Sequence, residues 1–155
     1  EHAQSDQQRL EAAGFDVQPV GRLERPVEFQ GSMQMACFDT VRFNQQPISG
    51  LRVYFCRHLT PQYIWDKELM QHPNGVRYIH TVVIGAPDAP QTARTLATLA
   101  DGEALIEEEQ CTVKLPNAEL IVQPRPGANS ARIERVILLH TDGNVREFLH
   151  GISPA

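Results

Sequence analysis

The alternation of apolar and polar residues predicts a chain built mainly from short strands. Residues 33–43 alternate well enough for one strand, with Ala36 and Phe38 on one face and Cys37 on the other. An extended segment is expected to start at 15–17, and two more apolar runs, 51–57 and 79–84, read as further strands. Shorter strands are expected near 104–107, 111–115, 119–123 and 132–140.

Two helices are expected between these strands. Residues 5–14 have a Ser or Asp cap at the start and Gly14 at the end, as helix boundaries usually do. A second helix covers about 91–100, where Asp88 and Pro90 precede it and Gly102 closes it. A further helix is predicted at 144–149, near the end of the chain.

The order of these elements repeats. Residues 76–125 read as strand, helix and three strands, the βαβββ unit, and residues 1–65 match it except for a missing first strand. The segment 132–155 then adds the C-terminal strand and helix. Two explanations of the vacant position stay open: the strand at 132–140 fills it, or an upstream segment supplies it.

The junction between the two halves contains the most specific sequence motifs in the chain. It contains the runs RHLTP (57–61), HPNG (72–75) and YIHTVVI (78–84), with Trp65 between the first two. This junction resembles that of glyoxalase-like proteins of the vicinal oxygen chelate superfamily. The resemblance implies an α+β fold in which paired βαβββ modules form curved mixed sheets around a cleft.

Composition limits the classes of partner. The chain of 155 residues has a formal charge of −5, which argues against nucleic acid, and its apolar runs are too short for a membrane helix. No secretory leader is visible, and three cysteines without a Cys-x-x-Cys pair favour a reducing cytoplasm. Cys37 and Cys56 are expected to be small core residues.

The resemblance also implies a metal site. Relatives hold a divalent ion, such as Fe, Mn, Ni, Zn or Mg, with side chains from the first and last strands of each module. His80 matches the first-strand histidine of the second module, and Glu119 matches the acidic, catalytic residue of its last strand. His58 is the nearest match for a third ligand, while the fourth ligand is absent. His80 and Glu119 are therefore predicted to point into one cleft.

A metal-free site is the alternative. The guanidinium of Arg57, beside His58, would oppose a bound cation. Arg57 could instead pair with a carboxylate or phosphate, Tyr54 could offer its hydroxyl, and Trp65 could form an apolar wall. The same residues also have a purely structural interpretation, in which Arg57 is a solvated cation at a strand end and Tyr54 packs against its neighbours. For Trp65 the structural interpretation, a residue that anchors a loop on the core, is favoured.

Two functions therefore remain open from the sequence. The first is a metal-dependent lyase or dioxygenase that acts on a small oxygenated substrate between the modules. The second is a metal-free protein that binds or sequesters a small molecule, like resistance proteins of the superfamily. Other catalytic motifs, including Gly-x-Ser-x-Gly and His-Glu-x-x-His, are absent. A homodimer is expected, since a module short of one strand leaves an edge to cover.

Overall fold

The computed structural model describes residues 3–67 and 70–148, which divide into two compact units. The first unit comprises Glu1–Pro47 and Arg52–Met70, and the second comprises Ile48–Leu51 and Gln71–Ala155. The break after residue 70 lies between the two predicted modules, but the assignment of residues 48–51 to the second unit was not anticipated. Within the described ranges, no helix is long and apolar enough to cross a membrane.

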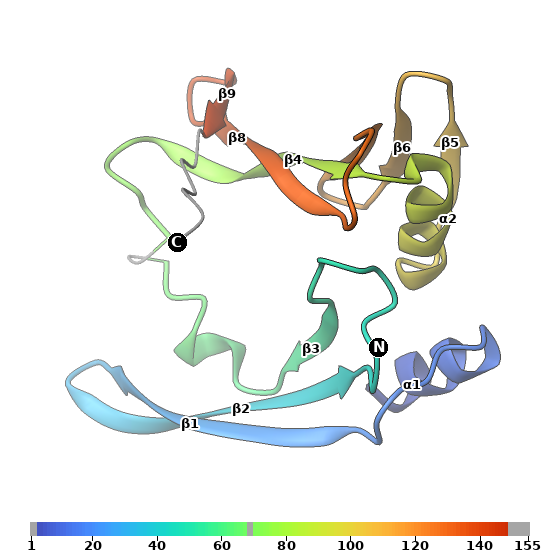
Figure 1. The fold of residues 1–155 in the computed structure, drawn as a ribbon. Helices are drawn as coiled ribbons and strands as arrows, with labels where there is room; N and C mark the ends of the chain where they lie inside the picture. Colours follow the sequence, from blue (N-terminus) through green and yellow to red (C-terminus); the bar gives the residue numbers. More distant parts are fainter. Residues whose placement is uncertain (1–2, 68–69, 149–155) are drawn as a thin grey trace. The chain divides into compact units, whose positions relative to one another are not determined.

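The first unit consists of one helix and one antiparallel sheet (Figure 1). The elements are α1 (Ala3–Ala12), β1 (Gly21–Phe29), β2 (Ser32–Arg42), β3 (Tyr54–His58) and the short 3-10 helix η1 (Pro61–Tyr63). The strand order is β1-β2-β3. Helix α1 packs against β2 and β3 and buries Leu10 completely. The helix therefore covers one face of the sheet.

The two faces of this sheet follow from the alternation along β2. Ala36, Phe38 and Thr40 are buried on one face, which confirms the predicted strand over residues 33–43. Val41 points to the other face and is fully buried there. Because β2 lies in the middle of the sheet, its pairing with β1 and β3 decides which of their side chains share each face.

Strand β1 itself was not predicted, since only an extended segment starting at 15–17 was expected, and its sequence explains why. It reads GRLERPVEF, and most of its side chains are exposed. An edge strand needs no alternating apolar face, and Pro26 is tolerated there because one side of the strand has no ladder to complete. The strand is therefore specified by its pairing with β2, with Leu23 opposite Phe38, rather than by a local pattern.

The second unit contains a complete βαβββ module followed by two more strands. The module is β4 (Val76–Ala86), α2 (Ala89–Leu99), β5 (Ala104–Ile106), β6 (Cys111–Lys114) and β7 (Glu119–Pro124), and β8 (Arg132–His140) and β9 (Val145–Phe148) follow. The sheet order is β5-β6-β7-β4-β8-β9, with β4 parallel to β7 and the other pairs antiparallel. The predicted α+β class is confirmed, and α2 packs against β5, β6 and β7.

Helix α2 forms as its boundary residues predict. The side chain of Asp88 accepts a hydrogen bond from the backbone nitrogen of Gln91 at 2.9 Å, as an N-cap does. Its apolar stripe buries Ala93 and Leu96 against the sheet. Asp101 follows the helix with φ of +55°, a left-handed conformation that stops it.

The C-terminal strand does not fill the vacant position of the first module. Strand β8 pairs with β4 and β9 in the second unit and with neither β2 nor β3, so that hypothesis is wrong. The helix predicted at 144–149 is also wrong: residues 145–148 form β9, and residue 149 lies outside the described residues. The Asp142-Gly143 turn, with Gly143 at φ +81°, folds the chain back so that β9 extends the ladder of β8.

Residues 48–51 are tightly held within the second unit. The carbonyl oxygen of Ser49 accepts a hydrogen bond from the backbone nitrogen of Ala131 at 2.8 Å, and Ile48 is buried. Gly50 has φ of +86°, and a Cβ atom added there would clash with the carbonyl oxygen of Ala131. Both the conformation and the close approach of the backbones require glycine at this position.

Candidate functional site

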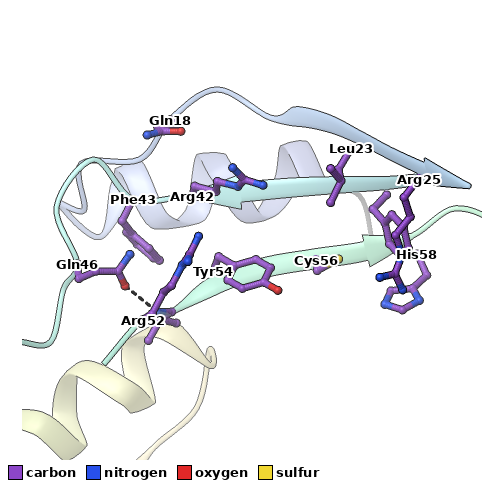
Figure 2. Close-up of a pocket in the computed structure, with 12 residues that line it drawn as sticks. Gln18, Leu23, Arg25, Arg42, Phe43, Gln46, Arg52, Tyr54, Cys56 and His58 are labelled. Atoms are coloured by element: carbon purple, nitrogen blue, oxygen red, sulfur yellow. Dashed lines mark hydrogen bonds between the residues drawn. The ribbon is translucent and has the colours of Figure 1, made fainter. Parts of the chain in front are cut away.

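A pocket of about 650 Å³ lies on the face of the first sheet opposite α1 (Figure 2). All of its lining residues belong to the first unit. They come from the three strands and from the chain on either side of them: Gln18, Leu23, Arg25, Phe38, Arg42, Phe43, Gln46, Arg52, Val53, Tyr54, Cys56 and His58. The volume falls within the range of about 300–1,000 Å³ that is usual for small-molecule sites.

Strand alternation explains which residues reach the pocket. In β3 the side chains of Tyr54, Cys56 and His58 point to the pocket, and those between them point to α1. The pairing of β3 with β2 sets Tyr54 beside Arg42 and His58 beside Phe38. The pocket floor is thus a continuous surface across three strands.

The charge of the pocket is opposite to that of the whole chain. Three arginines, Arg25, Arg42 and Arg52, line it, and no aspartate or glutamate does. Among residues 3–67 and 70–148 none of the three forms an ion pair. The chain carries a formal charge of −5, so this concentration of unpaired cations is a local property. Such a site attracts anions.

Cys56, on the floor of the pocket, is exposed, although it had been expected to be a small core residue. Cys56 is a free thiol on β3, while Cys37 is half-buried on the other face of the sheet. Burial of the sulfur raises the pKa of the Cys56 thiol, and the guanidinium groups of Arg25 and Arg42 oppose that rise by favouring the thiolate. Both arginines therefore act electrostatically on the middle of the pocket.

A side-chain hydrogen bond holds the segment that carries Arg52. The amide oxygen of Gln46 accepts from the backbone nitrogen of Val53 at 2.6 Å, drawn as the dashed line in Figure 2. This bond closes the loop between β2 and β3 just beside Arg52. It thereby restricts the backbone from which that arginine reaches the pocket.

His58 lies between two aromatic rings. Its ring meets the ring of Phe38 edge-on with centroids 5.0 Å apart, and it stacks on Trp65 with centroids 5.5 Å apart. The Nδ1 atom of His58 is buried and has no hydrogen-bond partner among the described residues. An unpaired buried nitrogen of this kind is costly unless a ligand or water satisfies it.

The structure separates the candidates that the sequence had grouped as ligand-binding residues. Tyr54 lines the pocket, as does the predicted metal ligand His58, but Arg57 does not. Arg57 lies on the α1 face, where it borders a cavity of about 80 Å³ together with Asp6 and Asp39. Trp65 is 58% exposed, so the prediction that it anchors a loop in the core is wrong. It covers the ring of His58 instead.

His80 and Glu119 lie on neighbouring strands of the second unit, but not in register. Strands β4 and β7 pair Thr81 with Glu119. The β4–β8 ladder is irregular between Ile79 and Thr81, so His80 is an extra residue there, and its Nδ1 lies 2.8 Å from Oγ1 of Thr81. The regular alternation that was expected to direct His80 is interrupted at this residue. That the side chains of His80 and Glu119 converge on one point stays a prediction.

The predicted metal ligands come from both units. His58 belongs to the first unit, and His80 and Glu119 belong to the second. Among the described residues, no group of three or more histidine, cysteine, aspartate or glutamate side chains is placed to hold a metal ion. Imidazole and carboxylate groups are chemically suited to Zn, Fe or Mn, and the joint binding of an ion by these three residues stays a prediction.

Comparison with known families identifies the fold. The family model of the glyoxalase-like domain matches residues 1–100, which include all three strands of the pocket and the chain through α2. The chain belongs to the glyoxalase-like domain family. The resemblance to the vicinal oxygen chelate superfamily is thereby confirmed, and the pocket lies wholly within the matched residues.

A solved structure supports the fold of this glyoxalase-like protein. The crystal structure of a hypothetical protein from Staphylococcus aureus superposes with a TM-score of 0.69 at 12% sequence identity. The match covers 96% of this chain and 62% of that chain, so the chain spans less than two thirds of that relative. At this identity the likeness concerns the fold alone. No curated protein matches the chain.

The arginines of the glyoxalase-like pocket were not predicted from the sequence. Arg25 lies on the strand that was missed, Arg42 ends β2, and Arg52 lies in the approach to β3. A signal existed for Arg42, because the alternation of residues 33–43 placed it on the same face as Phe38. Arg25 reaches this surface through the pairing of β1 with β2, and Arg52 reaches it from the loop that leads into β3.

Proposed function

We propose that this glyoxalase-like protein binds a small organic molecule that carries an anionic group. One observation supports the proposal above all: Arg25, Arg42 and Arg52 line a single pocket that has no acidic residue. Guanidinium groups bind carboxylates and phosphates through paired hydrogen bonds. Solubility alone does not require three arginines on one face of a small sheet, where their like charges repel one another.

Calorimetric titration with inorganic phosphate and with a short carboxylate tests the proposal. Arg42→Ala and Arg52→Ala should each weaken binding by about tenfold, because each removes a hydrogen bond to a charged ligand. The matched control is Arg57→Ala, since Arg57 lies on the same sheet but on the α1 face. No binding of either anion at millimolar concentration, or an equal loss in the Arg57 variant, would contradict the proposal.

A metal-dependent reaction is the second candidate, and the buried Nδ1 atom of His58 favours it. In this case His58, His80 and Glu119 would hold a divalent ion, and Glu119 would also serve as the catalytic group. A bound ion supplies Lewis acidity and can lower the pKa of a bound water. The two candidates differ in whether a metal or an arginine holds the oxygens of the ligand.

Metal content of the purified protein decides between the candidates. The metal hypothesis expects about one equivalent of a divalent ion, reduced in His58→Ala, His80→Ala and Glu119→Gln while the circular dichroism spectrum is unchanged. A chelator should then abolish ligand binding. Binding of phosphate that survives chelation and is lost in Arg42→Ala would favour the metal-free site.

A further inference from the structure

The floor of the pocket is organised in rows, because paired residues of neighbouring strands point to the same face. Three rows cross the sheet between its two ends. They consist of Arg42 and Tyr54, then Gly21, Thr40 and Cys56, then Leu23, Phe38 and His58. Along the strands the rows change from a cationic row to one of small residues and then to one with Leu23 and two rings, and Arg25, paired with Ala36, follows beyond it.

One end of the pocket is polar and cationic. Arg42 and Arg52 lie there, and the amide of Gln46 and the ring of Tyr54 lie beside them (Figure 2). Both guanidinium groups lack an acidic partner among the described residues. Two arginines without carboxylates provide up to ten N–H donors by the count of five per guanidinium, and this end is therefore suited to the oxygens of an acid.

The other end is apolar and aromatic. Leu23 is 42% exposed although its neighbours across the sheet are Phe38 and then His58. The guanidinium carbon of Arg25 lies 5.6 Å from the centroid of the Phe38 ring, so this third arginine is stacked on an aromatic face. A ring or compact apolar group placed here would cover Leu23 and lie within reach of the stacked guanidinium.

The row between the two ends has only small side chains. Gly21 has none, Cys56 is short, and the hydroxyl of Thr40 donates to the carbonyl oxygen of Gly21 at 3.3 Å. A Cβ added at Gly21 would meet only Oγ1 of Thr40, at an ordinary contact distance of 3.6 Å. No large side chain of this row separates the two ends of the pocket, so one ligand can extend from the arginine end to the aromatic end.

The dimensions of the pocket favour a ligand that is larger than a simple inorganic anion. Arg42 and Phe38 are four residues apart on β2, which corresponds to about 13 Å along the strand. A phosphate ion held by Arg42 and Arg52 would leave most of the 650 Å³ unfilled and the apolar end in water. We infer that the ligand is an aromatic organic acid, with its carboxylate or phosphate at Arg42 and Arg52 and its ring over the exposed Leu23, beside the guanidinium of Arg25 that covers Phe38.

This inference rests on the proposed function, and paired probes separate the two. Calorimetry compares 4-phenylbutyrate with butyrate and phenyl phosphate with inorganic phosphate. Trp65, the sole tryptophan, gives an independent fluorescence signal because it stacks on His58. We expect each aromatic probe to bind at least tenfold more tightly than its partner without the ring.

Two variants localise the ring. Leu23→Ser should remove most of the advantage of the aromatic probes and leave the affinity for inorganic phosphate unchanged, and it risks little stability because Leu23 is partly exposed. Gly21→Ile should block the small middle row and have the same selective effect. The exposed Met33, at 66% exposure and outside the pocket lining, gives the matched control Met33→Ser.

Each outcome has a distinct meaning. If all probes bind with equal affinity, or if adipate binds more tightly than 4-phenylbutyrate, the aromatic inference is overturned and the anion site stands. The second result would assign Arg25 to a second anionic group. If no probe binds, the proposed function fails and the inference with it.

Discussion

Arg57 and His58 are adjacent in the chain, but their side chains lie on opposite faces of the first sheet. His58 contacts Phe38 on the pocket side, while Arg57 pairs across the sheet with Asp39 and borders the cavity under α1. The electrostatic opposition between this guanidinium and a ligand at His58 is therefore weaker than chain adjacency indicates. The cations that matter to the pocket come from β1, the end of β2 and the approach to β3.

Salt should weaken binding at this site. Arg42 and Arg52 are exposed, so their attraction for an anionic ligand is screened as ionic strength rises. Titration of phenyl phosphate at low salt and again at physiological salt should show a loss of affinity of several-fold. The Arg42→Ala and Arg52→Ala double variant should have lost most of this dependence. An affinity of the unaltered protein that does not change with salt would count against guanidinium recognition.

Replacement of Gly50 should destabilise the second unit. In Gly50→Ala the new methyl group clashes with the carbonyl oxygen of Ala131, and the residue must also keep φ of +86°. The left-handed conformation alone costs about 1–2 kcal/mol for alanine. Urea unfolding should show a larger loss than that. The control is Gly127→Ala, where φ is +77° but the added Cβ has open space; equal losses in the two variants would refute the steric part.

The thiol of Cys56 should react slowly at neutral pH and faster as the pH rises. Burial raises its pKa, so at a given pH a smaller fraction is thiolate than in a free cysteine, and only the thiolate is alkylated. The measurement is the alkylation rate against pH in a Cys37→Ser background, because Cys111 is buried. An aromatic acid bound over the middle row should protect Cys56. A rate as fast as that of a free thiol, or no protection, would contradict this placement.

A homodimer remains an expectation that sedimentation can test. Among the described residues β9 pairs only with β8, and Val145 and Phe148 on it are each 51% exposed. An edge strand of this kind can pair with a second copy of the chain. The unaltered protein should sediment as a dimer at micromolar concentration, and Val145→Lys should shift it to a monomer. A monomer at high concentration would exclude the homodimer.

Elements could be predicted from the sequence where the local pattern of apolar and capping residues matches the burial found in the structure. The strand at 33–43 could be found because a buried face requires every second residue to be apolar, and α2 could be found because Asp88 caps it. β9 was mistaken for a helix because V-R-E-F is too short to show a period. The hairpin turn before it, rather than its own residues, makes it a strand.

The pocket was harder to predict than the fold because its parts are distant in the chain. Leu23, Phe38 and His58 form one row only because two strand registers align them. A shift of one residue in either ladder would turn a row member to the other face. Tyr54 and His58 could be selected from the sequence as residues of a chemically able type, but nothing local to Arg25 or Arg52 indicates which surface they share.

The fold of residues 48–51 has a consequence for any attempt to cut the protein into halves. The chain leaves the first unit after Pro47, enters the second, and returns at Arg52. A fragment ending at residue 70 would carry Ile48 and Gly50 without Ala131, whose backbone lies against this segment. Proteolysis after residue 70 would thus release a first half in which Ser49 has lost its hydrogen bond with Ala131. Residues 48–51 can therefore be studied in their native setting only in a chain that also contains Ala131.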